Sequence, residues 1–464
     1  MMKRILLTCI ICVLGVQLIG AQGIQFFSGN WKDVVAEAKS TGKPVFIDVY
    51  TSWCMPCKKM AKETFTQKEV GDYFNVHFVN YQIDAEKGEG ISIARQYKIT
   101  AYPTCLFVLP DGKLVHSFLG FQTVEQLLKQ GRQAVKNTML LPDLEKMDRE
   151  YQTGKRDKNF LIAYCGKRKD FGQRGGQPLN ELLRQFSDEE LSNAEYAEWL
   201  KSSTIYDKEL VDRLVRLTEA MKVAGDKKAF LKFDNTVMAT LSNYFNDAID
   251  NNRRPQFDHL FAAKERLDDI DASNRNNGML ASMGGGVSYM PKELIRLTFL
   301  RKNNDVDEFR HDYSAYMEQI MHDSPTDSLL RRSNTEARAY RDFMNDPSVS
   351  EEEKKSQEQG YGFLNLLTSV NAQLQAGSLF SSWDYYWGDR DLDDAQKATA
   401  VAWLKHLYAT WRNADLALPI ADKLVDLGQV DEAKNLLQDL ADYLKLTGDE
   451  DQQMTKVMKK LREL

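Results

Sequence analysis

The chain has 464 residues, of which 61 are Lys or Arg and 67 are Asp or Glu, so its formal net charge is −6. This length predicts two to four domains. Hydrophobic residues make up 43% and charged residues 28%, which excludes a wholly disordered chain, a collagen-like chain and a protein with many membrane spans. The acidic excess gives no basic field for nucleic acid, and six cysteines are too few for a disulfide-built scaffold.

Residues 1–21 have the pattern of a secretory signal peptide. Lys3 and Arg4 precede a long apolar run, and small residues end the segment before Gln22. Because the run approaches the lower length limit for a membrane span, a retained anchor is the alternative. Cleavage would leave four of the six cysteines, namely Cys54, Cys57, Cys105 and Cys165. The sequence therefore predicts an exported protein, located in the periplasm of a Gram-negative bacterium, where disulfides persist.

Residues 22–138 alternate between helical and strand-like patterns. The periodicity predicts helices at 30–40, 54–65, 91–97 and 123–135, and strands at 45–50, 76–83, 104–109 and 113–118. The first strand, VFIDVY, is almost wholly apolar, which is typical of a central strand buried on both faces. The order of elements predicts a βαβ unit followed by a hairpin and a terminal helix, and hence a small α/β domain.

Residues 139–464 carry helical periodicity without strand patterns, and we expect one or two all-α subdomains built from helical hairpins. The clearest hairpin spans 414–446, where Gly428 separates two amphipathic runs, as glycine often does after a helix. This stretch resembles a tetratricopeptide (TPR) hairpin, although no regular TPR period extends through the region. A loop is expected at 271–291, and a turn followed by a charged helix at 345–360.

The strongest chemical signal is the sequence Trp53–Cys54–Met55–Pro56–Cys57. Two cysteines on one helical turn can form a disulfide that opens readily. The first lies at the start of a helix, where unsatisfied N–H groups and the helix dipole stabilise a thiolate. The thiolate is the nucleophile of thiol–disulfide exchange, and the second cysteine, one turn inside and less exposed, can attack the resulting mixed disulfide. The motif therefore predicts redox activity.

A zinc site and an inert structural disulfide are the alternatives for this cysteine pair. Zinc would need two further ligands, commonly a second pair at short spacing, whereas His77, His116, Cys105 and Cys165 are scattered. We expect Cys105 to be a buried strand residue, with a third redox thiol as the alternative. Cys165 is expected in a helical core. A disulfide between Cys105 and Cys165 is an alternative that the sequence does not decide.

Aromatic residues cluster at 383–387 and recur at Trp403 and Trp411. Their helical spacing predicts that they face a core, with a groove for a partner protein as the alternative. The sequence contains none of the phosphate-loop, GxSxG, HExxH or dinucleotide-binding motifs that would indicate another chemistry.

Residues 24–138 resemble a thioredoxin fold. The resemblance combines the WCxPC motif, the acidic residue in the strand before it, and the later phrase Tyr102–Pro103–Thr104. It implies a cis peptide bond before Pro103, a bond that occurs mainly before proline. It also implies that an extended substrate pairs with the exposed backbone of Tyr102, and that Trp53 and Thr104 complete the substrate-binding surface.

Asp48 is the acidic residue of that strand. A carboxylate in an apolar strand is costly unless it is neutral or has a partner. The resemblance implies that Asp48 accepts the proton of Cys57, and a merely tolerated buried acid is the alternative. Thioredoxin places a lysine on the next strand near this acid, and the matching position here is Asn80. Tuning of the pKa of this acid by a lysine therefore does not carry over to this chain.

Residues 58–75 are similar to one branch of this superfamily, the exported bacterial domains that include the C-terminal domain of the transmembrane reductase DsbD. The resemblance implies that the dithiol donates electrons outside the cytoplasm. The residues between the cysteines, Met55 and Pro56, lack the histidine that would stabilise the Cys54 thiolate and make the pair strongly oxidising. A reductase is therefore favoured, and an oxidase or isomerase is the alternative.

The resulting hypothesis is an α/β thioredoxin-like N-terminal domain at 22–138, followed by a large all-α, TPR-like helical-hairpin region at 139–464. The protein is expected to act as an exported thiol–disulfide oxidoreductase that needs no metal or organic cofactor. Its expected partners are disulfide-bearing proteins, a thiol electron donor and a protein that binds the helical region, with no nucleic acid, and a membrane only if the signal segment is retained. The rival hypothesis is a non-catalytic interaction protein whose thioredoxin-like module only binds.

Overall fold

The computed structural model describes residues 23–270, 286–388, 391–447 and 452–464. The chain divides into two compact units, and the division falls after Arg174. The predicted signal peptide and most of the predicted loop at 271–291 lie outside the described residues. The first unit is α/β and the second is helical, so the predicted fold class is confirmed. Within the described ranges, every helix is too short or too polar to cross a membrane.

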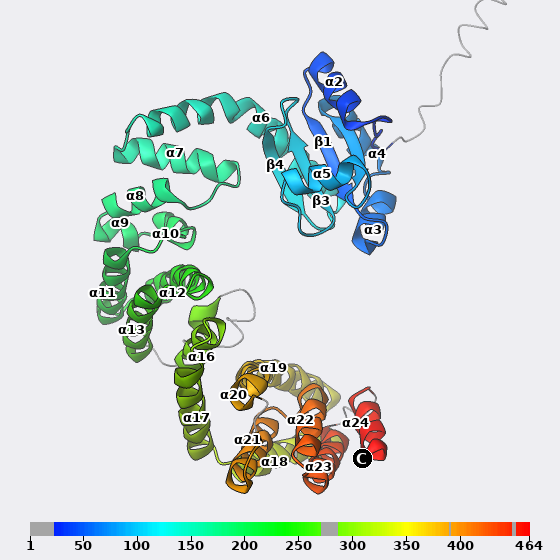
Figure 1. The fold of residues 1–464 in the computed structure, drawn as a ribbon, viewed down its shortest axis with the longest axis vertical. Helices are drawn as coiled ribbons and strands as arrows, with labels where there is room; N and C mark the ends of the chain where they lie inside the picture. Colours follow the sequence, from blue (N-terminus) through cyan, green and yellow to red (C-terminus); the bar gives the residue numbers. More distant parts are fainter. Residues whose placement is uncertain (1–22, 271–285, 389–390, 448–451) are drawn as a thin grey trace, which may run out of the picture. The chain divides into compact units, whose positions relative to one another are not determined.

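The first unit is built on a four-stranded mixed sheet (Figure 1). Its strands are β1 (Val45–Tyr50), β2 (Val79–Asp84), β3 (Thr104–Val108) and β4 (Leu114–Leu119), in the spatial order β2-β1-β3-β4. β1 runs parallel to β2 and antiparallel to β3, and β3 and β4 form the predicted hairpin. The helices of this unit are α2 (Trp31–Thr41), α3 (Met55–Glu63), α4 (Lys68–His77), α5 (Glu89–Gln96), α6 (Val124–Gln152) and α7 (Lys158–Asp170).

β1 is central because its side chains are apolar on both faces. Phe46 points to the face covered by α3, α4 and α6, and it packs there with Met60 and Phe74. Its neighbour Ile47 points to the opposite face, where α2 and α5 supply apolar residues such as Val34. Full burial of each such side chain stabilises the fold by about 1.5–3 kcal/mol. The two covered faces explain why this strand reads as a continuous apolar run.

Two element boundaries differ from the sequence prediction. The strand expected at 76–83 begins only at Val79, since the preceding residues finish α4, whose buried Phe74 anchors it to the sheet while Val76 is 61% exposed. The helix expected at 123–135 continues as α6 to Gln152. Its later turns bury further leucines, among them Leu144, so the stripe of buried apolar residues sets the length of the helix.

The second unit is helical throughout its described residues, apart from turns and one short 3₁₀ helix at Val287–Tyr289. Its helices are α8 (Gln177–Gln185), α9 (Asp188–Ser192), α10 (Ala194–Lys201), α11 (Lys208–Ala224), α12 (Lys227–Asp250), α13 (Arg254–Ile270), α16 (Lys292–Lys302), α17 (Val306–Asp323), α18 (Thr326–Asn345), α19 (Glu351–Ser381), α20 (Trp383–Trp387), α21 (Asp394–Thr410), α22 (Ala414–Asp426), α23 (Val430–Thr447) and α24 (Gln452–Glu463).

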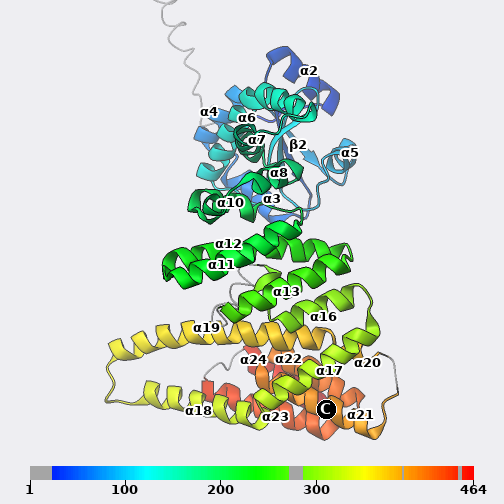
Figure 2. The same ribbon diagram turned by 90° about the vertical axis from the view of Figure 1, so that its left-hand side faces the viewer.

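Neighbouring helices of the second unit pack as successive layers, visible for α11, α12, α13 and α16 in Figure 2. The hairpin predicted near 414–446 is formed by α22 and α23, with Gly428 at a φ of 76° between them. A positive φ at this corner favours glycine because other residues meet steric strain there. The helical hairpin is thus confirmed, while its membership in a TPR array stays a prediction.

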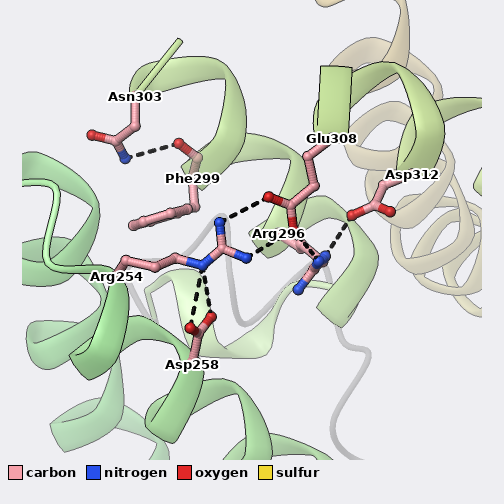
Figure 3. Close-up of polar contacts among 7 residues, drawn as sticks. All are labelled: Arg254, Asp258, Arg296, Phe299, Asn303, Glu308 and Asp312. Carbon is pink, nitrogen blue, oxygen red and sulfur yellow. Dashed lines mark hydrogen bonds and ion pairs between the residues drawn. The ribbon is translucent and has the colours of Figure 1, made fainter. Parts of the chain in front are cut away.

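An ion-pair network joins three helices of the second unit (Figure 3). Arg254 of α13 donates to both carboxylate oxygens of Glu308 on α17, at 2.8 and 2.9 Å, and to Asp258 one turn along its own helix. Arg296 of α16 donates to Glu308 and to Asp312 of α17, each at 2.5 Å. The side chains are partly exposed, but the bidentate pair and the shared carboxylates link α13, α16 and α17.

Candidate active site

The WCxPC motif lies on the turn between β1 and α3. β1 ends at Tyr50, and Cys54 is the N-cap residue of α3. The Cys54 N–H donates to the carbonyl of Thr51 at 3.2 Å, which closes the turn. Pro56 stands in the first turn of the helix, where its missing N–H leaves no helical hydrogen bond unmade. The local sequence therefore places Cys54 at the positive end of the dipole of α3.

Cys54 and Cys57 are joined by a disulfide, with their Cα atoms 5.3 Å apart. The Cys57 N–H donates to Cys54 Sγ at 3.1 Å, so an unsatisfied N–H group of α3 points at the first sulfur. The sequence predicted that Cys54 would be the more exposed of the two. In the structure the two cysteines are equally buried, with Cys54 3% and Cys57 4% exposed. Cys54 is buried because its sulfur forms part of the helix cap.

Asp48 lies on the face of β1 that α3 covers. It follows Phe46 by two residues, and Cys57 precedes Met60 by one helical turn, so acid and second cysteine share the layer between sheet and helix. Asp48 is 2% exposed, and burial raises its pKa from 3.8 to about 6, although hydrogen bonds from Gln82 and Cys105 oppose the shift. An acid of this strength can accept a thiol proton near neutral pH.

The two side chains that contact Asp48 were not identified as its partners from the sequence. Gln82 Nε2 donates to Asp48 Oδ2 at 2.9 Å, and Cys105 Sγ lies 3.6 Å from Asp48 Oδ1. Gln82 is the residue paired with Asp48 across β1 and β2, whereas Asn80 pairs with Phe46. A register count between the two strands would have found it, because directly paired residues share one face of a sheet.

Tyr102, Pro103 and Trp53 lie together beside the disulfide turn. The Tyr102–Pro103 peptide is cis, as predicted. The rings of Trp53 and Tyr102 meet edge to face with centroids 6.0 Å apart, and Trp53 is 62% exposed. Trp53 Nε1 also donates to Glu86 at 2.9 Å, a contact that the sequence did not reveal. The Thr104 hydroxyl donates to the carbonyl of Ala101 at 2.7 Å and so bonds within the loop. The structure therefore places the two predicted aromatic residues of the binding surface next to Cys54.

Cys105 and Cys165 are buried and neither is in a disulfide, so the Cys105–Cys165 bridge that the sequence left open is absent. The predictions that Cys105 is a buried strand residue and that Cys165 is a core residue are confirmed. Trp383, Trp387 and Trp403 are also buried, which agrees with the predicted core. Among the described residues, no three His, Cys, Asp or Glu side chains gather as metal ligands.

The first unit combines a strand, a turn in which Cys54-Met55-Pro56-Cys57 begins a helix, and a cis-proline loop. A family described as the thioredoxin-like domain matches residues 31–134. A thioredoxin-like protein of Synechocystis is 36% identical over 88 residues, which are 19% of this chain and 78% of that protein. The chain therefore belongs to the thioredoxin-like family through its first unit.

Two further relatives match the same part of the chain. The thiol:disulfide interchange protein DsbD of Yersinia pestis is 28% identical over 95 residues, which are 20% of this chain and 16% of that protein. The crystal structure of the oxidised DsbD C-terminal domain of Neisseria meningitidis is 27% identical, with a TM-score of 0.21, and the match covers 22% of this chain and 90% of that one. The predicted resemblance to DsbD is thus confirmed by the sequence match.

Proposed function

We propose that this protein is an exported thiol–disulfide oxidoreductase that reduces disulfides of other proteins through Cys54 and Cys57. The observation that carries the proposal is the joined cysteine pair at the N-terminus of α3, beside an exposed Trp53 and a cis-proline loop. The family membership supports the chemistry, because thioredoxin-like relatives include thiol:disulfide interchange proteins. Trp53, Tyr102, Pro103 and Thr104 would bind the substrate segment.

The reaction starts from the dithiol form. The Cys54 thiolate attacks one sulfur of the substrate disulfide, and the other substrate sulfur leaves as a thiolate. Cys57 then gives its proton to Asp48 and attacks Cys54 Sγ. The bond between Cys54 and the substrate breaks, and the second substrate sulfur leaves with the electron pair. Two electrons have passed to the substrate, and a thiol electron donor restores the dithiol.

The reducing direction is supported by the residues between the cysteines. Neither Met55 nor Pro56 can donate a hydrogen bond or a charge from its side chain to the Cys54 thiolate, so these two residues add nothing to the stabilisation that the start of the helix provides. The equilibrium reduction potential tests this direction. A value near roughly −270 mV would mark a reductant, and one near roughly −120 mV would mark an oxidant and overturn the proposed direction.

Export and the role of the helical region belong to the same proposal. Residues 1–21 have the composition of a signal peptide. N-terminal sequencing of the secreted protein should begin at Gln22, and material that begins at Met1 would contradict cleavage. The helical unit, 175–464, is proposed to bind a partner protein, because helical hairpins present extended surfaces. Trapping mixed disulfides with Cys57→Ser would identify the proteins that reach Cys54.

Reduction of insulin by dithiothreitol tests the catalytic proposal. The wild type should accelerate the reaction, and Cys54→Ser should reduce the rate to that of dithiothreitol alone. Cys165→Ser is the matched control, because it also removes one thiol but lies in α7, outside the proposed site. Equal rates for the wild type and Cys54→Ser would reject catalysis and leave a binding module.

A further inference from the structure

In each cycle of the proposed function, the carboxyl group of Asp48 must gain a proton and lose it again. Its side chain is buried, so a proton that leaves it needs a polar group that reaches solvent. In the described chain, two side chains form hydrogen bonds with the carboxyl group, Gln82 at Oδ2 and Cys105 at Oδ1. These two contacts decide in which direction the proton can leave.

The contact with Cys105 offers the proton no path to solvent, because Cys105 lies in the core. It lies on β3, between β1 and β4, and its side chain is fully buried among Phe46, Phe107 and Phe118. Burial and the neighbouring Asp48 carboxylate raise the pKa of the Cys105 thiol well above its usual value. The thiol therefore stays protonated and has no contact with solvent to which it could pass a proton.

The contact with Gln82 connects Asp48 to the surface of the domain. The side chain of Gln82 is half-buried and lines an open pocket of about 380 Å³ on the sheet face that carries Asp48. The other lining residues come from the segment before α2 and from the end of α3 and the turn after it, namely Gly23, Ile24, Phe26, Ala61, Phe65 and Thr66. None of the lining residues belongs to the WCxPC turn or to the cis-proline loop. The pocket, called the Gln82 pocket below, is thus a separate route to water.

An amide is suited to a carboxyl group that changes its protonation state. The Nε2 group of Gln82 donates to the ionised form of Asp48. After a half-turn of the amide, Oε1 can accept from the protonated form. A lysine at this position would donate only, and its charge would hold the carboxyl group ionised. Gln82 can therefore keep the Asp48 carboxyl group oriented in both states.

Other charged groups do not replace this contact. The titratable side chains that the elements on this face turn at least partly inward are Cys57 of α3, Tyr73 and His77 of α4, Cys105 of β3, and His116 of β4, which bonds to Gln130 of α6. The other acidic side chains of α3, α4 and α6 up to residue 137, and the lysines of α4 and α6 in the same stretch, are exposed, namely Glu63, Lys68, Glu69, Asp72, Glu125, Lys129 and Lys136. The lysines of α3 are exposed, and Arg132 of α6 lies over the ring of Tyr73. No charged side chain is among the causes that shift the pKa of Asp48.

We propose that Gln82 is a positioning residue that holds the Asp48 carboxyl group and connects it to solvent in the Gln82 pocket. This inference rests on the proposed function. As Cys57 bonds to Cys54 and the substrate sulfur leaves with its electron pair, the Cys57 proton moves to Asp48. Asp48 then releases that proton to water in the Gln82 pocket, and not across the substrate-binding surface.

The first test measures the titration of Asp48 in the oxidised protein by ¹³C NMR, with Asp48→Asn to assign the signal. Gln82→Leu should raise the midpoint by about one pH unit, because the carboxylate loses its donor. Gln82→Lys should lower the midpoint. Gln67→Leu is the matched control, since Gln67 is an exposed amide of the same unit. An unchanged midpoint in both Gln82 variants would overturn the proposal.

The second test measures the pH dependence of insulin reduction at saturating dithiothreitol. Below the midpoint, Gln82→Leu should be about tenfold slower than the wild type, and the loss should disappear at high pH. Ala61→Leu narrows the Gln82 pocket without touching Asp48, so it should lower the rate at every pH and leave the midpoint unchanged. Ala61→Ser, which keeps the pocket open, should match the wild type. A wild-type rate in Ala61→Leu would refute the pocket as the proton route.

The two proposals fail in different ways. If the wild type itself does not reduce insulin, the proposed function is wrong, and the NMR midpoints still decide whether Gln82 controls the carboxyl group of Asp48. If the wild type is active and the Gln82 variants follow its pH profile, the proposed function stands and the role of Gln82 is refuted.

Discussion

Replacing Asp48 by Asn should stabilise the oxidised first unit at neutral pH. Burial raises the pKa of Asp48 from 3.8 to about 6, so ionisation is harder in the folded than in the unfolded chain. This shift corresponds to about 3 kcal/mol. Because the folded pKa is raised, the stability linked to this group is fully present below pH 3.8 and is lost as the pH rises through about 6. Asn has no proton to lose, and it can still accept the hydrogen bond from Gln82.

The assay is amide hydrogen exchange of β1 in the intact, oxidised chain, which measures the opening of the first unit alone. Relative to the wild type, Asp48→Asn should gain about 2.5 kcal/mol of opening free energy between pH 4 and pH 8. Asp72→Asn is the control, because it makes the same chemical change at an exposed position of α4. It should alter the opening free energy by less than about 0.5 kcal/mol. A gain at pH 8 no larger than the gain at pH 4 would show that Asp48 is not a destabilised buried acid.

Three further substitutions test other contacts of the first unit. Glu86→Ala frees the indole of Trp53, so the KM for insulin should rise about threefold to tenfold with little change in kcat; an unchanged KM would remove Trp53 from the substrate surface. Gly90→Ala brings a methyl group against the carbonyl oxygen of Asp84 and should lower the unfolding free energy by about 2 kcal/mol or more, measured by β2 hydrogen exchange. Asn137→Ala leaves two backbone carbonyls of β4 and α7 without their donor and should cost about 1–3 kcal/mol in the same measurement, whereas wild-type protection would contradict this role.

The chemistry of the site could be predicted from the sequence because the residues that carry it form short, local motifs. The cysteine pair, the helix start and the proline loop are short motifs, and each fixes its own backbone geometry. The contacts around Asp48 were not readable in the same way. They depend on the register of β1 against β2 and β3, which sets Gln82 and Cys105 on either side of the carboxyl group. Strand register is a tertiary property, and a shift of one residue would turn both side chains away.

The exposure of Cys54 was predicted incorrectly for a related reason. Helix periodicity alone places the N-cap residue at the surface, but it does not include the hydrogen bond from the Cys57 N–H that ties Cys54 Sγ into the cap of α3. The extra length of α6 was missed because the predicted helix ended at residue 135, whereas leucines beyond that point are buried. For α6, the burial of these leucines set the length of the helix.

The hydrogen bonds of Asn137 have a practical consequence for dissecting this protein. Its Nδ2 group donates to Val115 on β4 at 2.8 Å and to Asp170 at the end of α7 at 3.2 Å. A chain cut after residue 138 would lose α7 and the second half of α6, including the buried Leu141 and Leu144. A fragment that ends at Arg174 keeps both hydrogen bonds of Asn137. The shortest fragment suited to redox assays therefore includes the helical hairpin formed by α6 and α7.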